Sequence, residues 1–131
     1  MGKYLAVHGI KPDKILCSTS RRTKETFEYL SLKGNIEYTD RLYLASANEL
    51  LGMVAKIPES VHSLMLIGHN PGLQELCLKL AKHGDETLLE QLIAKFPTCG
   101  LATIAFDGAW RDIGRAHATL AGFISPKMLK D

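Results

Sequence analysis

The sequence predicts an α/β fold, in which short apolar strands alternate with amphipathic helices along the chain. The best-marked strand, Ser63–Gly68, is apolar on both faces, as central strands of parallel sheets are. The best-marked helix begins at a capping box, Ser46–Glu49, and has apolar residues at helical spacing after it. With 131 residues, the chain has the length of a single domain, residues 1–131, which can bury a core without metal or disulfide support.

The other elements are bounded by turn or capping residues, and we expect them in the following order. They are a helix end at 3–7, a strand at 14–18, a helix at 22–33, a strand at 35–39, a helix opened by Asn70-Pro71, a helix capped by Asp85, and strands at 101–106 and 117–123. The basic run at 79–83 is interpreted as a helix end, where cations are favoured by the helix dipole. The first helix contains Met1 without any N-cap residue before it, which we interpret as a hint that a preceding segment is absent.

Composition excludes several classes of protein. The formal net charge of +2 does not indicate a nucleic-acid binder, and no apolar run reaches the ~20 residues that span a bilayer. The three cysteines have no CxxC spacing, which favours a reduced, cytoplasmic protein. We therefore expect neither a nucleic-acid nor a membrane partner. No histidine or cysteine spacing indicates a metal site, and we expect no cofactor.

The first candidate site is the junction Gly68-His69-Asn70-Pro71-Gly72. The strand before it would deliver His69 to the carboxyl end of a sheet, where α/β proteins bind ligands. The helix after it would offer free N–H groups to an anion, with Asn70 at its N-cap position. These features predict a phosphate site that includes His69 and Asn70. The alternative is a histidine that only caps a turn.

The second candidate site is the strand-to-helix junction Ser18-Thr19-Ser20-Arg21-Arg22. Arginine binds phosphate through a planar fork of donors, and hydroxyl groups add contacts. Ser18, Arg21 and Arg22 are therefore further candidates for phosphate binding. The alternative is that both arginines are solvated surface residues. The other four histidines of the chain lie near predicted turns and are interpreted as surface residues.

Four segments together resemble one family. They are similar, in their order along the chain, to motifs of the phosphohistidine phosphatase SixA branch of the histidine phosphatase superfamily. The segments are GIKPDKILCSTSRRTKET, RLYLASANELL, LMLIGHNPGLQEL and FPTCGLATIAFDGAW. The resemblance runs from about Met1 to Pro126 and implies a three-layer, phosphoglycerate mutase-like sheet flanked by helices. It also implies removal of phosphoryl groups from a phosphohistidine protein, or from a small phosphoester, through a phosphohistidine enzyme intermediate.

By this resemblance, the second catalytic histidine of the family corresponds to His69 and its mid-chain arginine to Arg22. Arg21 occupies a position that is usually apolar or neutral in the family, so an exchange of roles between the two arginines stays open. The general acid is not identified by the resemblance, with Asp40 and Glu49 as candidates. Thr19 replaces a usual proline, which is a mild departure.

The resemblance departs seriously at the beginning of the chain. Family members open with a strand that ends in Arg-His-Ala or Arg-His-Gly, whose histidine is the nucleophile, and no Arg-His pair occurs in these 131 residues. We therefore expect a truncated domain that lacks its central first strand and is inactive alone. The strands 63–68 and 101–106 are then expected to have open edges and to favour self-association. Two alternatives stay open: a phosphate-binding pseudophosphatase or phosphorelay module, and an interaction fragment without a ligand.

Overall fold

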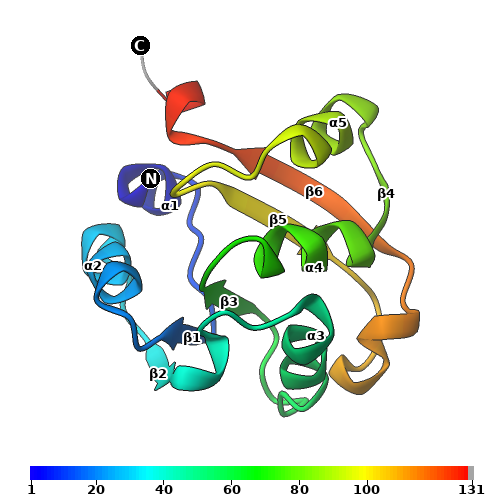
Figure 1. Cartoon of the computed structure of the whole chain (residues 1–131), viewed down its shortest axis with the longest axis horizontal. Coiled ribbons are helices and arrows are strands. Elements are labelled where there is room, and N and C mark those ends of the chain that lie inside the picture. Colours follow the sequence, from blue (N-terminus) through cyan, green and yellow to red (C-terminus); the bar gives the residue numbers. More distant parts are fainter. Residues whose placement is uncertain (130–131) are drawn as a thin grey trace. The chain divides into compact units, whose positions relative to one another are not determined.

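The computed structural model describes residues 1–129 and confirms the α/β class (Figure 1). The chain divides into two compact units, which are described separately. The first unit comprises residues 1–45 and 60–69, and the second comprises residues 46–59 and 70–131. Each unit contains one three-stranded sheet, so the six strands form two small sheets flanked by helices.

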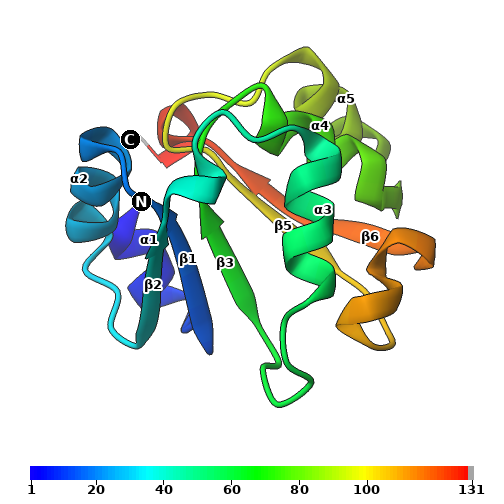
Figure 2. The ribbon, with the colours of Figure 1, turned by 60° about the horizontal axis from the view of Figure 1, so that its bottom comes forward.

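The sheet of the first unit is parallel throughout, with the strand order β2-β1-β3 (Figure 2). Its central strand β1 has a hydrogen-bonded neighbour on each side, and the side chains of Ile15 and Cys17 have no exposed surface. The elements of this unit are α1 (Gly2–Val7), β1 (Lys14–Ser18), α2 (Arg21–Leu30), β2 (Asn35–Thr39), the 3-10 helix η1 (Asp40–Leu42) and β3 (Leu64–Ile67).

Helix α2 ends earlier than the sequence predicts. The predicted stop was Gly34, but the helix ends at Leu30, where Ser31 adopts the left-handed conformation with φ of 56°. A residue in this conformation at the end of a helix terminates it. Serine is an uncommon residue in this conformation, which is why the later glycine was the stronger signal for the end of the helix.

The sheet of the second unit has the strand order β4-β6-β5, with β5 antiparallel and β4 parallel to the central strand β6. The core beside it is built on Leu92, Leu120 and Phe123, which are at most 3% exposed. The elements of this unit are α3 (Ala47–Ala55), α4 (Gly72–Leu80), β4 (Ala81–Gly84), α5 (Glu86–Ala94), β5 (Leu101–Ala105), η2 (Trp110–Arg115), β6 (Ala118–Ile124) and η3 (Pro126–Leu129).

The prediction of a helix end over residues 79–83 was wrong beyond Leu80. Residues 81–84 form β4, which pairs with Ala118–Leu120 of β6. Gly84 has a φ of 151°, and a Cβ there would lie 3.1 Å from the Cβ of Leu120, so glycine permits this close approach. Pairing with a distant strand overrides the local helical preference of this basic segment.

Strands β3 and β5 are each the last strand of their own sheet, as the sequence led us to expect for these two segments. Each has one hydrogen-bonded neighbour, β1 for β3 and β6 for β5. Over residues 1–129, no helix is both long and apolar enough to cross a membrane.

The predicted capping box of α3 is confirmed and provides a test of stability. The Glu49 amide donates to Ser46 Oγ at 3.1 Å, and the Ser46 amide donates to Glu49 Oε1 at 3.2 Å. Ser46→Ala removes the cap and should lower the free energy of unfolding by about 1 kcal/mol. Urea-induced unfolding measures this change. Ser60→Ala, at an exposed turn position, is the control and should change stability by less than about 0.5 kcal/mol.

Candidate functional site

Ser18 and His69 meet at the carboxyl edge of the first unit's sheet. The parallel pairing of β1 with β3 sets Cys17 opposite Ile67, and the chain beyond both residues leaves the sheet at the same edge. Ser18 Oγ lies 2.9 Å from His69 Nε2, within hydrogen-bond distance. Ser18 has no exposed surface, whereas His69 is partly exposed. The structure thus brings together two of the predicted site residues.

A second contact orients the histidine ring. The ring of Tyr43 meets that of His69 edge to face, with centroids 5.2 Å apart and an interplanar angle of 83°. This is a favourable aromatic geometry. Tyr43 follows η1, so the imidazole is held both from the end of β1 and from the segment after β2.

The turn from β1 into α2 is fixed by hydroxyl groups. Thr23 Oγ1 donates to the main-chain oxygen of Ser18 at 2.7 Å. The Ser20 amide donates to Ser18 Oγ at 3.3 Å, and Ser20 Oγ caps the helix by accepting from the Thr23 amide. The first turn of α2, which carries Arg22, is therefore tied to the strand end that carries Ser18.

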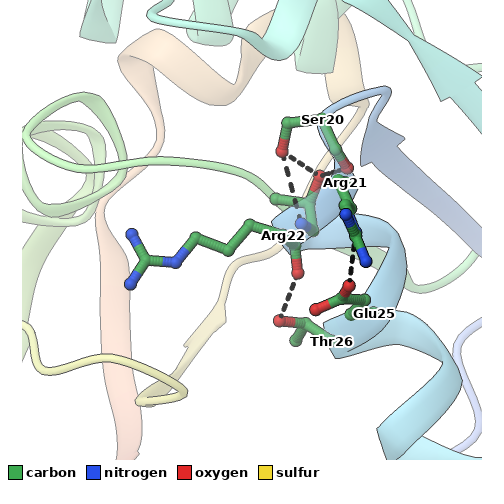
Figure 3. A network of polar contacts seen from close by, with 6 residues as sticks. Ser20, Arg21, Arg22, Glu25 and Thr26 are labelled. Atoms are coloured by element: carbon green, nitrogen blue, oxygen red, sulfur yellow. Dashed lines mark hydrogen bonds and ion pairs between the residues drawn. The ribbon is translucent and has the colours of Figure 1, made fainter.

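The two arginines of this turn differ in their partners (Figure 3). Arg21 Nε donates to Glu25 Oε1 at 2.9 Å, an ion pair one helical turn along. The side chain of Arg22 extends in another direction, and no hydrogen bond or ion pair to its guanidinium is found within residues 1–129 (Figure 3). The main-chain oxygen of Arg22 accepts a hydrogen bond from Thr26 Oγ1 at 3.0 Å. Of the two arginines, Arg22 is thus the one whose guanidinium has no partner within the described residues.

Asn70 belongs to the second unit, and its amide is already engaged there. Its Nδ2 donates to the Phe96 oxygen at 2.8 Å, and its Oδ1 accepts from the Gln74 amide at 3.2 Å. The predicted arrangement, with Asn70 as N-cap and Pro71 as first helical residue, was wrong by one residue: Pro71 is the N-cap and α4 starts at Gly72. The side chain of Asn70 reaches the amide four residues on, one turn into the helix, and so caps from outside it.

The carboxylates suggested as general acids both have partners. Glu49 completes the capping box of α3, and Asp40 accepts a hydrogen bond from Thr19 Oγ1. Cys17, which precedes Ser18, is not an activated thiol: burial raises its pKa, and the hydrogen bond with Thr23 and the charge of Lys24 offset this effect in part. Within residues 1–129, no group of three or more histidine, cysteine or acidic side chains is arranged to hold a metal ion.

Thr23 and Tyr43 are the site residues that the sequence did not identify. A threonine three residues after a serine N-cap indicates a polar helix start, but not that its hydroxyl would reach back to the strand. Tyr43 lies within RLYLASANELL, one of the segments that carry the family resemblance, yet its contact with His69 is formed only by the tertiary structure.

Comparisons with known proteins agree with the expected family. No protein-family model matches the chain. The uncharacterized protein Rv1276c of Mycobacterium tuberculosis is 31% identical over 128 residues, which are 96% of this chain and 81% of the relative. A solved structure from Nakamurella multipartitia, assigned as the phosphohistidine phosphatase SixA, has a TM-score of 0.86 and 26% identity, and the match covers 95% of this chain and 77% of that one. Its counterpart from Agrobacterium tumefaciens has a TM-score of 0.76 and 28% identity, over 95% and 75% of the two chains.

Proposed function

The chain belongs to the family of Rv1276c, and from the fold that it shares with two SixA structures we propose that it binds the phosphoryl group of a phosphohistidine protein. In this proposal it is a phosphatase-like protein of the histidine phosphatase superfamily. His69 and Arg22 hold the phosphoryl oxygens, and both units form one domain. A location in the cytoplasm belongs to the same proposal.

Two observations carry the proposal: the ring of His69 is fixed by its neighbours, and the guanidinium of Arg22 is free of partners within the described residues. His69 is oriented by Ser18 and Tyr43, and Arg22 leaves the helical turn that is tied to the Ser18 main chain. A guanidinium and an imidazolium bind phosphoryl oxygens through charge-assisted hydrogen bonds. The imidazole of His69 is held in place before binding and loses little freedom when the ligand arrives, which favours affinity.

Arg22→Ala and His69→Gln test the proposal. Each change should weaken binding of inorganic phosphate, measured by isothermal titration calorimetry, by about tenfold or more, since a hydrogen bond to a charged group contributes about 1.5–3 kcal/mol. The matched control is Arg21→Ala, which removes the same charge from the same helical turn but from a side chain that pairs with Glu25. The control should retain affinity within about twofold. If Arg21→Ala and Arg22→Ala lost equal affinity for phosphate, the effect would come from the net charge of the helical turn and not from a specific contact of Arg22. That result would contradict the proposal.

Turnover requires a nucleophile as well as a phosphate site. In the family this is the histidine of an Arg-His pair, and these 131 residues contain no such pair. The only cysteine in β1, Cys17, has a raised pKa because it is buried. We therefore propose that residues 1–131 alone bind the phosphoryl group without forming a covalent intermediate, as a phosphate-binding module would.

A phosphohistidine-labelled phosphocarrier protein distinguishes binding from catalysis. Incubated with the chain, it should release phosphate at the rate of spontaneous hydrolysis, and no label should appear on the chain itself. Time courses of released and protein-bound label measure both. Release above the spontaneous rate that is lost in His69→Gln would mean that these residues turn the substrate over by themselves.

We also propose that the chain associates with a second copy of itself through the open edges of β3 and β5. An edge strand offers unpaired main-chain donors and acceptors to another chain. Two exposed threonines allow a matched test: Thr103 is on the edge strand β5, and Thr119 is on β6, which is paired on both sides. Thr103→Lys should lower the mass observed by sedimentation at high protein concentration, because an edge lysine opposes strand pairing. Thr119→Lys adds the same charge and should not. A monomer at all concentrations would refute self-association.

A further inference from the structure

We propose that Ser18 is a positioning residue, whose hydroxyl donates to Nε2 of His69 and keeps the proton of the neutral ring on Nδ1. The Nδ1–H group is then the donor that His69 offers to a phosphoryl oxygen. The last step rests on the proposed function, whereas the assignment of the ring proton does not. Ser18 accordingly acts through His69, and the expectation that it contacts phosphate directly is replaced.

The hydrogen-bond capacity of the Ser18 hydroxyl leads to this assignment. A serine hydroxyl has one proton to donate and two lone pairs that accept. The Ser20 amide, at 3.3 Å, donates to one of the lone pairs. Ser18 has no exposed surface, so bulk solvent does not take the hydroxyl proton. Among residues 1–129, His69 Nε2 at 2.9 Å is the acceptor within reach. A buried hydroxyl without an acceptor costs about 1–3 kcal/mol, which favours donation to the ring.

The state of the ring follows from that donation. A neutral imidazole has one protonated nitrogen and one acceptor, so an Nε2 that accepts from Ser18 leaves the proton on Nδ1. In the charged ring both nitrogens are protonated, and Nε2–H then faces the second lone pair of Ser18 Oγ. Nδ1 therefore carries a proton in both charge states.

The surroundings of His69 leave Nδ1 available. No hydrogen bond to Nδ1 is found within the described part of the chain, and the residue is partly exposed. The edge-to-face contact with Tyr43 opposes rotation of the ring, which would exchange the two nitrogens. Without the Ser18 hydroxyl, the proton of the neutral ring can move from Nδ1 to Nε2. Nδ1 is then a hydrogen-bond acceptor, and it cannot donate to the oxygen of a phosphate anion, which is also an acceptor.

Proton–nitrogen correlation NMR on protein with isotope-labelled histidine reads the protonation of each ring nitrogen directly. His69→Gln identifies the His69 signals among those of the five histidines. In mildly alkaline buffer without phosphate, His69 should show a protonated Nδ1 and an unprotonated Nε2. Ser18→Ala should shift both signals toward a mixture of tautomers and weaken phosphate binding about fivefold, the effect of one hydrogen bond. Ser18→Thr, which keeps the hydroxyl, should restore the pattern of the unaltered protein.

Ser20→Ala is the matched control, because it removes a hydroxyl from the same turn that does not contact His69. It should leave the His69 signals unchanged. A protonated Nε2 in the neutral, unaltered protein overturns the proposal whatever the variants do, as does a Ser18→Ala variant with an unchanged tautomer. An Nδ1–H tautomer that depends on Ser18, in a protein without phosphate affinity, supports the positioning role and instead refutes the proposed function.

Discussion

The parallel pairing of β1 with β3 is the constraint on which the candidate site depends. It sets Cys17 beside Ile67, so that Ser18 and His69 leave the sheet at the same edge. The side chains of β1 from Ile15 to Ser18 are all buried, so both faces of this strand belong to the core. The contact between Ser18 and His69 is therefore a consequence of how these two strands pair in the core.

Around this pair, each polar group has a distinct task, and neighbouring residues of the same type differ in theirs. Arg21 forms an ion pair with Glu25, whereas the guanidinium of Arg22, in the same helical turn, has no partner within the described residues. Asn70, which follows His69 directly, uses its amide to connect the start of α4 with Phe96. Of the residues predicted to bind phosphate, Arg21 and Asn70 thus have side-chain partners within the described part of the chain, whereas the guanidinium of Arg22 has none there.

Features specified by neighbouring residues were predictable from the sequence, and features specified by distant ones were not. The capping box at Ser46, the cap at Asp85 and the strand at Lys14–Ser18 have local signals, and the structure contains them. The strand at Ala81–Gly84 has none, because its stability comes from pairing with β6 far along the chain. The same holds for Tyr43 and for the choice between Arg21 and Arg22, which depend on where a side chain points after folding.

The two compact units are interleaved along the chain, and this affects the order in which they can fold. The first unit is completed by residues 60–69, which follow a segment, residues 46–59, that belongs to the second. During synthesis, His69 must emerge before the first unit can close, and by then α3 has left the ribosome with its apolar residues Leu50 and Val54 still without the partners that bury them. Because neither unit is one continuous stretch, no single cut separates them, and α3 packs against α4 and η2, which both follow His69 in the chain.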